Sequence, residues 1–178
     1  LPEMSIIELS SNDLAQKAVN FAFENNGPLY IRLDKGPFPE WKEYNIDFSK
    51  GYRIIQTLSK LNIVTNGYMT RTALKVADTL IDEGIDCGVV DLFRVKPFPE
   101  EFYEEVISPS KKIVSIEESC KTGGLGSALS ELIAQNDNNC RLHVIGAPDK
   151  QFIEYGEREW FHEKYLLDAK GIIESIVG

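Results

Sequence analysis

Residues 111–131, KKIVSIEESCKTGGLGSALSE, decide how the rest of the chain is interpreted. The apolar run at 113–116 is short and rich in β-branched residues, which is typical of a buried strand. Three glycines, Gly123, Gly124 and Gly126, then lead into an apolar helical period. The stretch therefore predicts a strand, a glycine-rich turn and a helix. In a parallel α/β sheet this order brings the turn to the carboxyl edge, where such folds gather their ligands.

The glycine turn admits two interpretations. Glycine lets the backbone take a positive φ or lets another segment come close, and the N–H groups at the start of the helix form a weak anion site. The plainer interpretation, which the pattern alone favours, is a tight turn that packs the helix on its strand. The pattern is neither GxGxxG nor a P-loop, because no Lys-Ser/Thr pair follows the last glycine.

The composition is that of an ordinary soluble globular protein, with 43% hydrophobic and 26% charged residues among 178. The net charge of −9 argues against nucleic acid or an anionic membrane as a partner, because both require a clustered basic surface. No membrane-spanning run or signal peptide is visible. Cys87, Cys120 and Cys140 show neither metal-site nor disulfide spacing, so we expect a reducing cytoplasm. The start at Leu1, without methionine, suggests a piece of something longer.

Strand patterns alternate with helix patterns along the chain, which predicts a parallel-rich α/β sheet. We expect strands at 5–9, 28–34, 52–56, 61–65, 87–93, 112–117 and 141–146. We expect helices after 10–13, at 70–83, from 99 to about 107, up to about 136, and around Trp160 and Ile172.

Residues 36–50 interrupt this order. Gly36, Pro37 and Pro39 break regular structure, and the spaced aromatic residues that follow suggest a linker that lies against a surface. We therefore place a domain boundary here.

Few residues could carry chemistry. Arg32 and Lys35 are the best candidates, because two cations at the carboxyl end of a strand could hold a phosphate or carboxylate. Surface charge at a domain edge is the alternative of equal weight. Glu117 and Glu118 could form an acid–base couple, but adjacent strand residues face opposite sides.

The two histidines do not complete a catalytic site. His143 lies in a predicted strand and is expected to be structural, and His162 is expected at a surface or an interface. No Ser-His-Asp, Cys-His, HExxH or CxxC arrangement is recognisable, so the sequence predicts no catalytic residue and no metal site on this chain.

Four blocks carry a family resemblance. They are PLYIRLDKG at 28–36, the run 62–101, IVSIEESCKTGGLGSALSELIA at 113–134, and GAPDKQFIEYG at 146–156. In this order they resemble the last third of thiamine-diphosphate enzymes of the transketolase group. That group includes transketolase, 1-deoxy-xylulose-5-phosphate synthase and the beta subunits of 2-oxoacid dehydrogenases.

The resemblance implies a fold and a division into domains. Residues 1–35 correspond to the end of the pyrimidine-binding domain, residues 36–50 to a linker and residues 51–178 to the C-terminal domain. The fold class it implies is α/β, with three layers around a mostly parallel five-stranded sheet, preceded by a strand–helix–strand remnant. It also implies packing on the remaining domains or subunit, and a homodimer.

The resemblance further implies transfer of a two-carbon ketol unit between sugar phosphates, with the cofactor as electron sink. The family's Gly-Asp-Gly motif is absent here, and its activating glutamate lies before the matching region. Thiamine diphosphate and magnesium would therefore be bound elsewhere in the complete enzyme, and we expect this chain alone to be inactive.

Some residues correspond by position to family motifs. Lys35 falls where the family has a basic residue, usually arginine, that contacts the substrate phosphate, and Arg32 matches the strand arginine. Lysine pairs with phosphate as a point charge but lacks the bidentate fork. The glycine loop matches the family's loop. The family's PD-F-G signature, with one extra residue between the second and third positions, corresponds to Pro148, Asp149, Phe152 and Gly156.

Other interpretations stay open. A 1-deoxy-xylulose-5-phosphate synthase and a 2-oxoacid dehydrogenase beta subunit are the alternatives within enzymes. A non-catalytic interaction module, or a flavodoxin-like binder of a small ligand at 123–126, are alternatives of other classes. A strand–helix–strand remnant and an aromatic linker would have no purpose in a self-contained binder.

Overall fold

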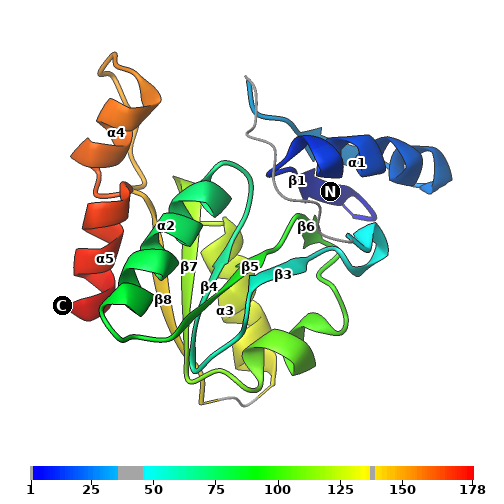
Figure 1. Ribbon diagram of the computed structural model, residues 1–178. Helices are drawn as coiled ribbons and strands as arrows, with labels where there is room; N and C mark the ends of the chain where they lie inside the picture. Colours follow the sequence, from blue (N-terminus) through cyan, green and yellow to red (C-terminus); the bar gives the residue numbers. More distant parts are fainter. Residues whose placement is uncertain (1, 36–45, 137–138) are drawn as a thin grey trace.

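The computed structural model describes residues 2–35, 46–136 and 139–178 (Figure 1). Its centre is a five-stranded sheet in the order β3-β5-β4-β7-β8. β4 pairs in parallel with β5 and β7, β7 pairs in parallel with β8, and β3 is antiparallel to β5. The mostly parallel five-stranded sheet is thereby confirmed. The strands are β3 (Arg53–Gln56), β4 (Leu61–Thr65), β5 (Cys87–Asp91), β7 (Lys112–Cys120) and β8 (Arg141–Ala147).

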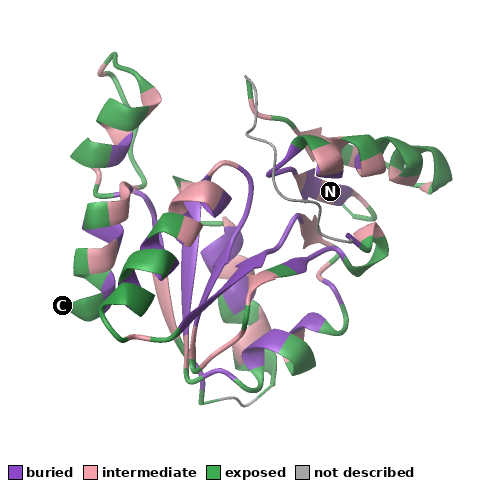
Figure 2. Cartoon of the chain, viewed as in Figure 1, coloured by how far each residue is buried: buried purple, intermediate pink, exposed green. Residues whose placement is uncertain are grey.

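Helices cover both faces of this sheet, which gives the expected three layers. On one face, α2 (Met69–Asp82) packs with α5 (Ala169–Val177); on the other lie α3 (Leu125–Gln135) and the short π-helix η2 (Tyr103–Ile107). The helix α4 (Arg158–Lys164) lies beyond α5. Buried residues are concentrated between the layers (Figure 2). No helix in the described part of the chain is long and apolar enough to cross a membrane.

The amphipathic spacing of α2 explains its place. Ala73, Ala77 and Leu80 recur at intervals of three and four and are fully buried against the sheet. The chain turns sharply after the helix, at Gly84, whose φ is +83°.

A second sheet forms at the N-terminus, in the order β2-β1-β6. β1 (Ser5–Glu8) pairs in parallel with β2 (Leu29–Arg32) and α1 (Asn12–Glu24) connects them, as the sequence predicts. The third strand, β6 (Arg94–Lys96), comes from the larger part of the chain and is antiparallel to β1.

The sequence did not predict β6, because the apolar pattern of residues 87–93 indicates a single strand that ends before it. β5 ends at Asp91, and the next two residues, Leu92 and Phe93, are as completely buried as the strand itself. Hydrophobicity therefore could not show where the strand stops. Phe93 belongs to the core of the N-terminal sheet, so the chain crosses here from one core to the other.

The described end of the 36–50 segment packs on this N-terminal core. Phe48 lies in the short 3₁₀ turn η1 (Phe48–Lys50), and its ring centroid is 5.5 Å from Phe21 and 5.0 Å from Phe93. At least one linker aromatic residue therefore lies against a surface, as expected; Trp41 and Tyr44 fall outside the described residues.

Candidate functional site

Charged and aromatic side chains from both sheets meet where β1, β2, β4 and β7 end. We call this group the carboxyl-edge network; it consists of Glu8, Arg32, Asp34, Tyr68, Glu118, Arg158 and His162. In parallel α/β sheets this edge is where ligands bind.

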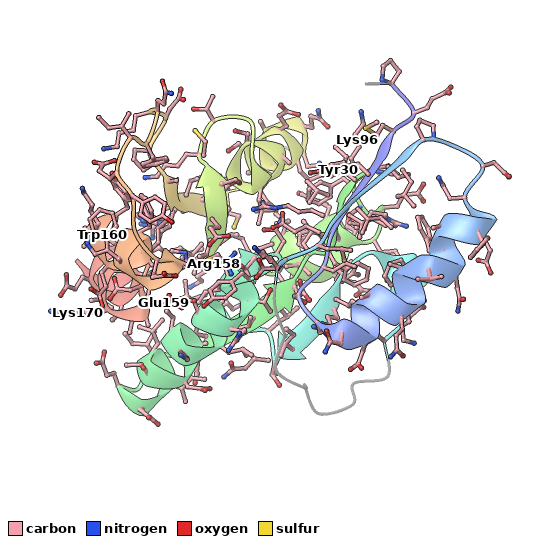
Figure 3. All side chains as sticks on the ribbon, turned by 90° about the horizontal axis from the view of Figure 1, so that it is seen from above. Tyr30, Lys96, Arg158, Glu159, Trp160 and Lys170 are labelled. Atoms are coloured by element: carbon pink, nitrogen blue, oxygen red, sulfur yellow. The ribbon has the colours of Figure 1, made fainter. Side chains whose placement is uncertain are left out.

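Arg158, in the first turn of α4, connects most of the network. Its Nη1 and Nη2 atoms donate to the two carboxylate oxygens of Asp34, each at 2.7 Å, while its Nε lies 2.8 Å from Glu118 Oε1. Its guanidinium carbon lies 4.0 Å from the centroid of the Tyr68 ring. In Figure 3 Arg158 lies on the inner side of α4, and Trp160 lies on the outer side. A bidentate pair of this kind fixes direction as well as distance.

The Glu118 carboxylate, in β7 of the five-stranded sheet, contacts three other members of the network. Its Oε1 also accepts from His162 Nε2 at 2.9 Å, and its Oε2 lies 3.8 Å from Arg32 Nη2. Burial alone would raise the pKa of Glu118, but the His162 hydrogen bond and the Arg158 charge outweigh it, so the pKa lies below its ordinary value. His162, expected at a surface or an interface, is not a surface residue: it is only 7% exposed, because it faces inward from α4 toward Glu118.

The structure places Arg32 and Lys35 in different surroundings. Arg32 Nη1 lies 3.1 Å from Glu8 Oε1, so this guanidinium pairs with the chain's own carboxylates. Burial raises the pKa of Glu8 above its ordinary value, against the effect of Arg32. Lys35 is exposed, and its ammonium group forms no ion pair with another described residue. Its backbone N–H donates to Asp34 Oδ1 at 2.8 Å.

The glycine loop holds the other acid of the pair. Glu117 is 1% exposed and accepts from the backbone N–H groups of Leu125 and Gly126, each at 2.9 Å. The anion site at the start of α3 is therefore filled by this carboxylate. A Cβ on Gly124 would collide with the carboxylate and lie 2.8 Å from the carbonyl oxygen of Cys120. Glu117 and Glu118 face opposite sides of β7, as predicted, and form no acid–base couple.

The positive φ expected in the loop is found at Gly123, at +77°. Gly126 must lack a side chain for another reason, because a Cβ there would collide with Val144 of β8. The close approaches that Gly124 and Gly126 allow are thus to groups of the same domain.

A cavity of about 340 Å³ opens beside the network. Its polar wall is formed by Glu118, Arg158 and His162, and its apolar side is formed largely by Phe152, Phe161 and Tyr165. The Phe152 ring stacks edge-on against the Tyr165 ring with centroids 4.9 Å apart, so the PD-F-G segment closes the aromatic side.

A second polar cluster is fully buried between the two sheets. Asp91 Oδ2 accepts from Arg53 Nε at 2.9 Å and from the hydroxyl of Ser10, and Thr70 Oγ1 lies 3.4 Å from Oδ1. Burial raises the pKa of Asp91, although the Arg53 charge opposes this. We call Ser10, Arg53, Thr70 and Asp91 together the buried clamp. It joins the end of β1 to β3, β5 and α2.

The sequence left several of these residues unassigned. Asp91 had a signal, since a carboxylate inside an apolar strand must find a partner. Asp34 and Arg158 had none, because they are 124 positions apart. His143, expected to be structural, lies in β8 with its Nε2 2.9 Å from Ser175 Oγ of α5.

The residues present do not fit a magnesium–diphosphate site. The sequence has no Gly-Asp-Gly, and the described residues contain no group of three His, Cys, Asp or Glu side chains placed to hold a metal ion.

Comparisons with known proteins agree on one family. Residues 51–172 match the family described as transketolase, C-terminal domain. The chain is 32% identical over 182 residues to the 1-deoxy-D-xylulose-5-phosphate synthase of Listeria monocytogenes, covering 99% of this chain and 30% of that protein. It is 27% identical over 172 residues to a subunit of the apulose-4-phosphate transketolase of Actinobacillus succinogenes, covering 96% of this chain and 55% of that subunit.

A solved structure described as split gene transketolase, inactive beta4 tetramer, superposes with a TM-score of 0.86 at 31% identity, covering 99% of this chain and 57% of that one. The chain thus spans less than two thirds of each of these relatives. The family match extends over well over half of the chain, and the fold superposes on a solved transketolase structure over 99% of the chain. This chain therefore belongs to the transketolase family and carries that family's C-terminal domain.

Proposed function

We propose that this chain is the C-terminal part of a thiamine-diphosphate-dependent transferase that moves a two-carbon ketol unit between sugar phosphates. The family match supports the reaction class, ketol transfer. The exposed Lys35 at the carboxyl edge supports the substrate class, a sugar phosphate. In this proposal, residues 1–35 complete a pyrimidine-binding domain, 36–50 form a linker and 51–178 form the C-terminal domain.

Lys35 is the residue we assign to the substrate phosphate. It is exposed beside the carboxyl ends of two parallel strands and has no described acidic partner to compete with an anion. Arg32 adds positive charge from the end of β2, with 42% of its side chain exposed, although two carboxylates already share it. A lysine holds phosphate as a point charge, so we expect tolerance of different sugar lengths.

The cofactor belongs to other parts of the complete enzyme. The transketolase and 1-deoxy-xylulose-5-phosphate synthase family depends on thiamine diphosphate, and we propose that magnesium and the diphosphate are bound outside this chain. The partner would be the remaining cofactor-binding domains or a separate subunit, in a cytoplasmic homodimeric assembly. Two relatives, one described as a transketolase subunit and the other as a split gene transketolase, support a divided arrangement.

A 1-deoxy-xylulose-5-phosphate synthase is the second candidate. The 32% identity to a synthase over 99% of this chain favours it. The product distinguishes the two enzymes: the complete enzyme would form either 1-deoxy-xylulose 5-phosphate or a ketose lengthened by two carbons.

The test is Lys35→Ala in the complete enzyme. Losing a hydrogen-bonded charge costs about 1.5–3 kcal/mol, so KM for a phosphorylated acceptor should rise roughly 10- to 100-fold. Turnover at saturation should fall less, because a remote anchor contributes mostly uniform binding. Lys170→Ala is the matched control: the Lys170 side chain is 83% exposed and lies on α5, on the side of the molecule away from the N-terminal sheet (Figure 3). An unchanged KM for every phosphorylated sugar tested would leave Lys35 as edge charge.

A further inference from the structure

We infer that Arg158 is a positioning residue for the substrate edge: through Asp34 it fixes the backbone from which Lys35 reaches the substrate phosphate. This inference rests on the role proposed for Lys35. It assigns a function to a residue of α4 that lies outside every motif recognised in the sequence.

One carboxylate carries both contacts. Asp34 Oδ1 accepts from Arg158 Nη2 at 2.7 Å and from the backbone N–H of Lys35 at 2.8 Å. The second oxygen, Oδ2, accepts from Arg158 Nη1 at 2.7 Å, so the carboxylate cannot rotate without breaking the pair. The direction in which Lys35 leaves the strand is therefore tied to the guanidinium group.

Arg158 is itself held from two other sides. Its Nε lies 2.8 Å from Glu118 Oε1, and Glu118 is held in turn by His162. The guanidinium also lies over the Tyr68 ring, at the start of α2. A group locked by packing and by further hydrogen bonds can hold another residue within the narrow limits that binding geometry demands.

Lys35 needs such support because it lies beyond the sheet. β2 ends at Arg32, and among the described residues the last backbone–backbone hydrogen bond along this edge runs from the Leu9 N–H to the Arg32 carbonyl. Lysine has a long flexible stem, so the position of its backbone decides where its charge can reach. The Arg158 hydrogen bond also holds the pKa of Asp34 below its ordinary value, so the carboxylate stays ionised at neutral pH.

The kinetic test uses Arg158→Gln and Arg158→Lys in the complete enzyme. We expect Arg158→Gln to raise KM for a phosphorylated acceptor at least fivefold, with a smaller change in kcat and no change in KM for the unphosphorylated sugar. Arg158→Lys keeps the charge but loses the fork, so it should restore KM only in part. Arg71→Gln is the matched control. The Arg71 guanidinium carbon also lies over the Tyr68 ring, 5.5 Å from its centroid, but the hydrogen bonds to Asp34 come from Arg158.

A double-mutant cycle separates positioning from general stability. If Arg158 acts through Lys35, then Arg158→Gln should add little to KM in a Lys35→Ala background, because the anchor is already gone. Additive effects, or equal increases in KM with phosphorylated and unphosphorylated sugars, would overturn the inference. If Lys35→Ala raises KM and Arg158→Gln does not, the inference fails while the proposed function stands. If Lys35→Ala itself has no effect, the inference and the role proposed for Lys35 both fail.

A second measurement does not depend on activity. In the purified chain, NMR should show the Lys35 amide exchanging faster in Arg158→Gln, and the Asp34 carboxyl titrating nearer its ordinary pKa. Asp34→Asn keeps the side-chain shape and serves if Arg158→Gln assembles poorly; it should reproduce the KM effect. An unchanged Lys35 amide in both variants would overturn the inference.

Discussion

Glu117 and Glu118 are neighbours in sequence, but their carboxylates bind different groups. Strand alternation sends Glu117 to the start of α3 and Glu118 to the carboxyl-edge network. The sequence was sufficient to predict this divergence, and the glycine loop has the positive φ that its glycines allow. The role of Lys35 and Arg32 at the substrate stays a prediction. The sequence could not supply Arg158 as the partner of Asp34, because a pairing between distant segments leaves no periodic signal.

The glycine loop gives a stability prediction. Gly124→Ala should lower the free energy of unfolding by about 2 kcal/mol or more, because the new Cβ displaces the buried Glu117 carboxylate from its N–H donors. Gly123→Ala is the matched control: its Cβ would meet nothing within 4 Å, so only the left-handed backbone opposes it, at about 1–2 kcal/mol. Urea unfolding of both variants measures the difference. Equal losses would show that the carboxylate moves at little cost.

The Asp34–Arg158 pair gives a pH prediction. A carboxyl whose pKa is lower in the folded chain stabilises the fold while ionised, and this contribution disappears as pH falls through the folded pKa. Both Asp34 and Glu118 have lowered pKa values. Arg158→Gln should therefore destabilise by about 1–2 kcal/mol near neutral pH, and by much less once the pH has fallen below the folded pKa values, which lie under the ordinary value of about 4. Urea unfolding of wild type and variant across this range measures the gap; a gap independent of pH would contradict the assignment.

Among the elements, those with a clean hydrophobic period were predictable. The short β-branched runs of β4, β7 and β8 and the three-four spacing of α2 indicated strands and a helix by their length and spacing. β6 and η2 were not predictable in form, since β6 is only three residues long and exists through its pairing with β1. The helix expected from 99 to 107 is reduced to a π-helix at Tyr103–Ile107. For β6, pairing with a distant strand decides the structure where the local pattern does not.

The buried clamp holds the two sheets together, and its loss should be costly. Asp91→Asn removes the charge that Arg53 faces in a fully buried site, which typically costs about 3–5 kcal/mol when one partner of a buried pair is removed. Ser10→Ala is the control, because it removes a neutral hydroxyl that bonds to both Asp91 and Arg53 but leaves the ion pair itself, and should cost about 1.5–3 kcal/mol. Chemical unfolding measures both losses. Hydrogen exchange should show β1 losing protection before β4 in Asp91→Asn; a loss below that of Ser10→Ala would show that the clamp does not hold the sheets together.

At the scale of the whole molecule, the N-terminal sheet is firmly attached but incompletely covered. β6 and the buried clamp join it to the main domain. Yet three large apolar side chains of this part of the chain are exposed: Phe23 of α1 at 87%, Tyr30 of β2 at 53%, and Leu33, which follows β2, at 64%. The chain also spans about 30% of the length of a synthase relative. The proposed cofactor-binding partner would cover these side chains in the complete enzyme.

That arrangement gives a prediction about the isolated chain: it should not bind thiamine diphosphate and magnesium. A ligand at 100 times its dissociation constant stabilises the state that binds it by about 2.7 kcal/mol, which would raise Tm by roughly 5–10 °C for a chain of this size. We expect no shift, because the described residues offer no metal-binding cluster and the sequence has no Gly-Asp-Gly. Calorimetric titration beside a ketol-transfer assay checks this, with the complete enzyme as positive control. Micromolar cofactor binding, or turnover by the isolated chain, would require the cofactor site to lie within these 178 residues.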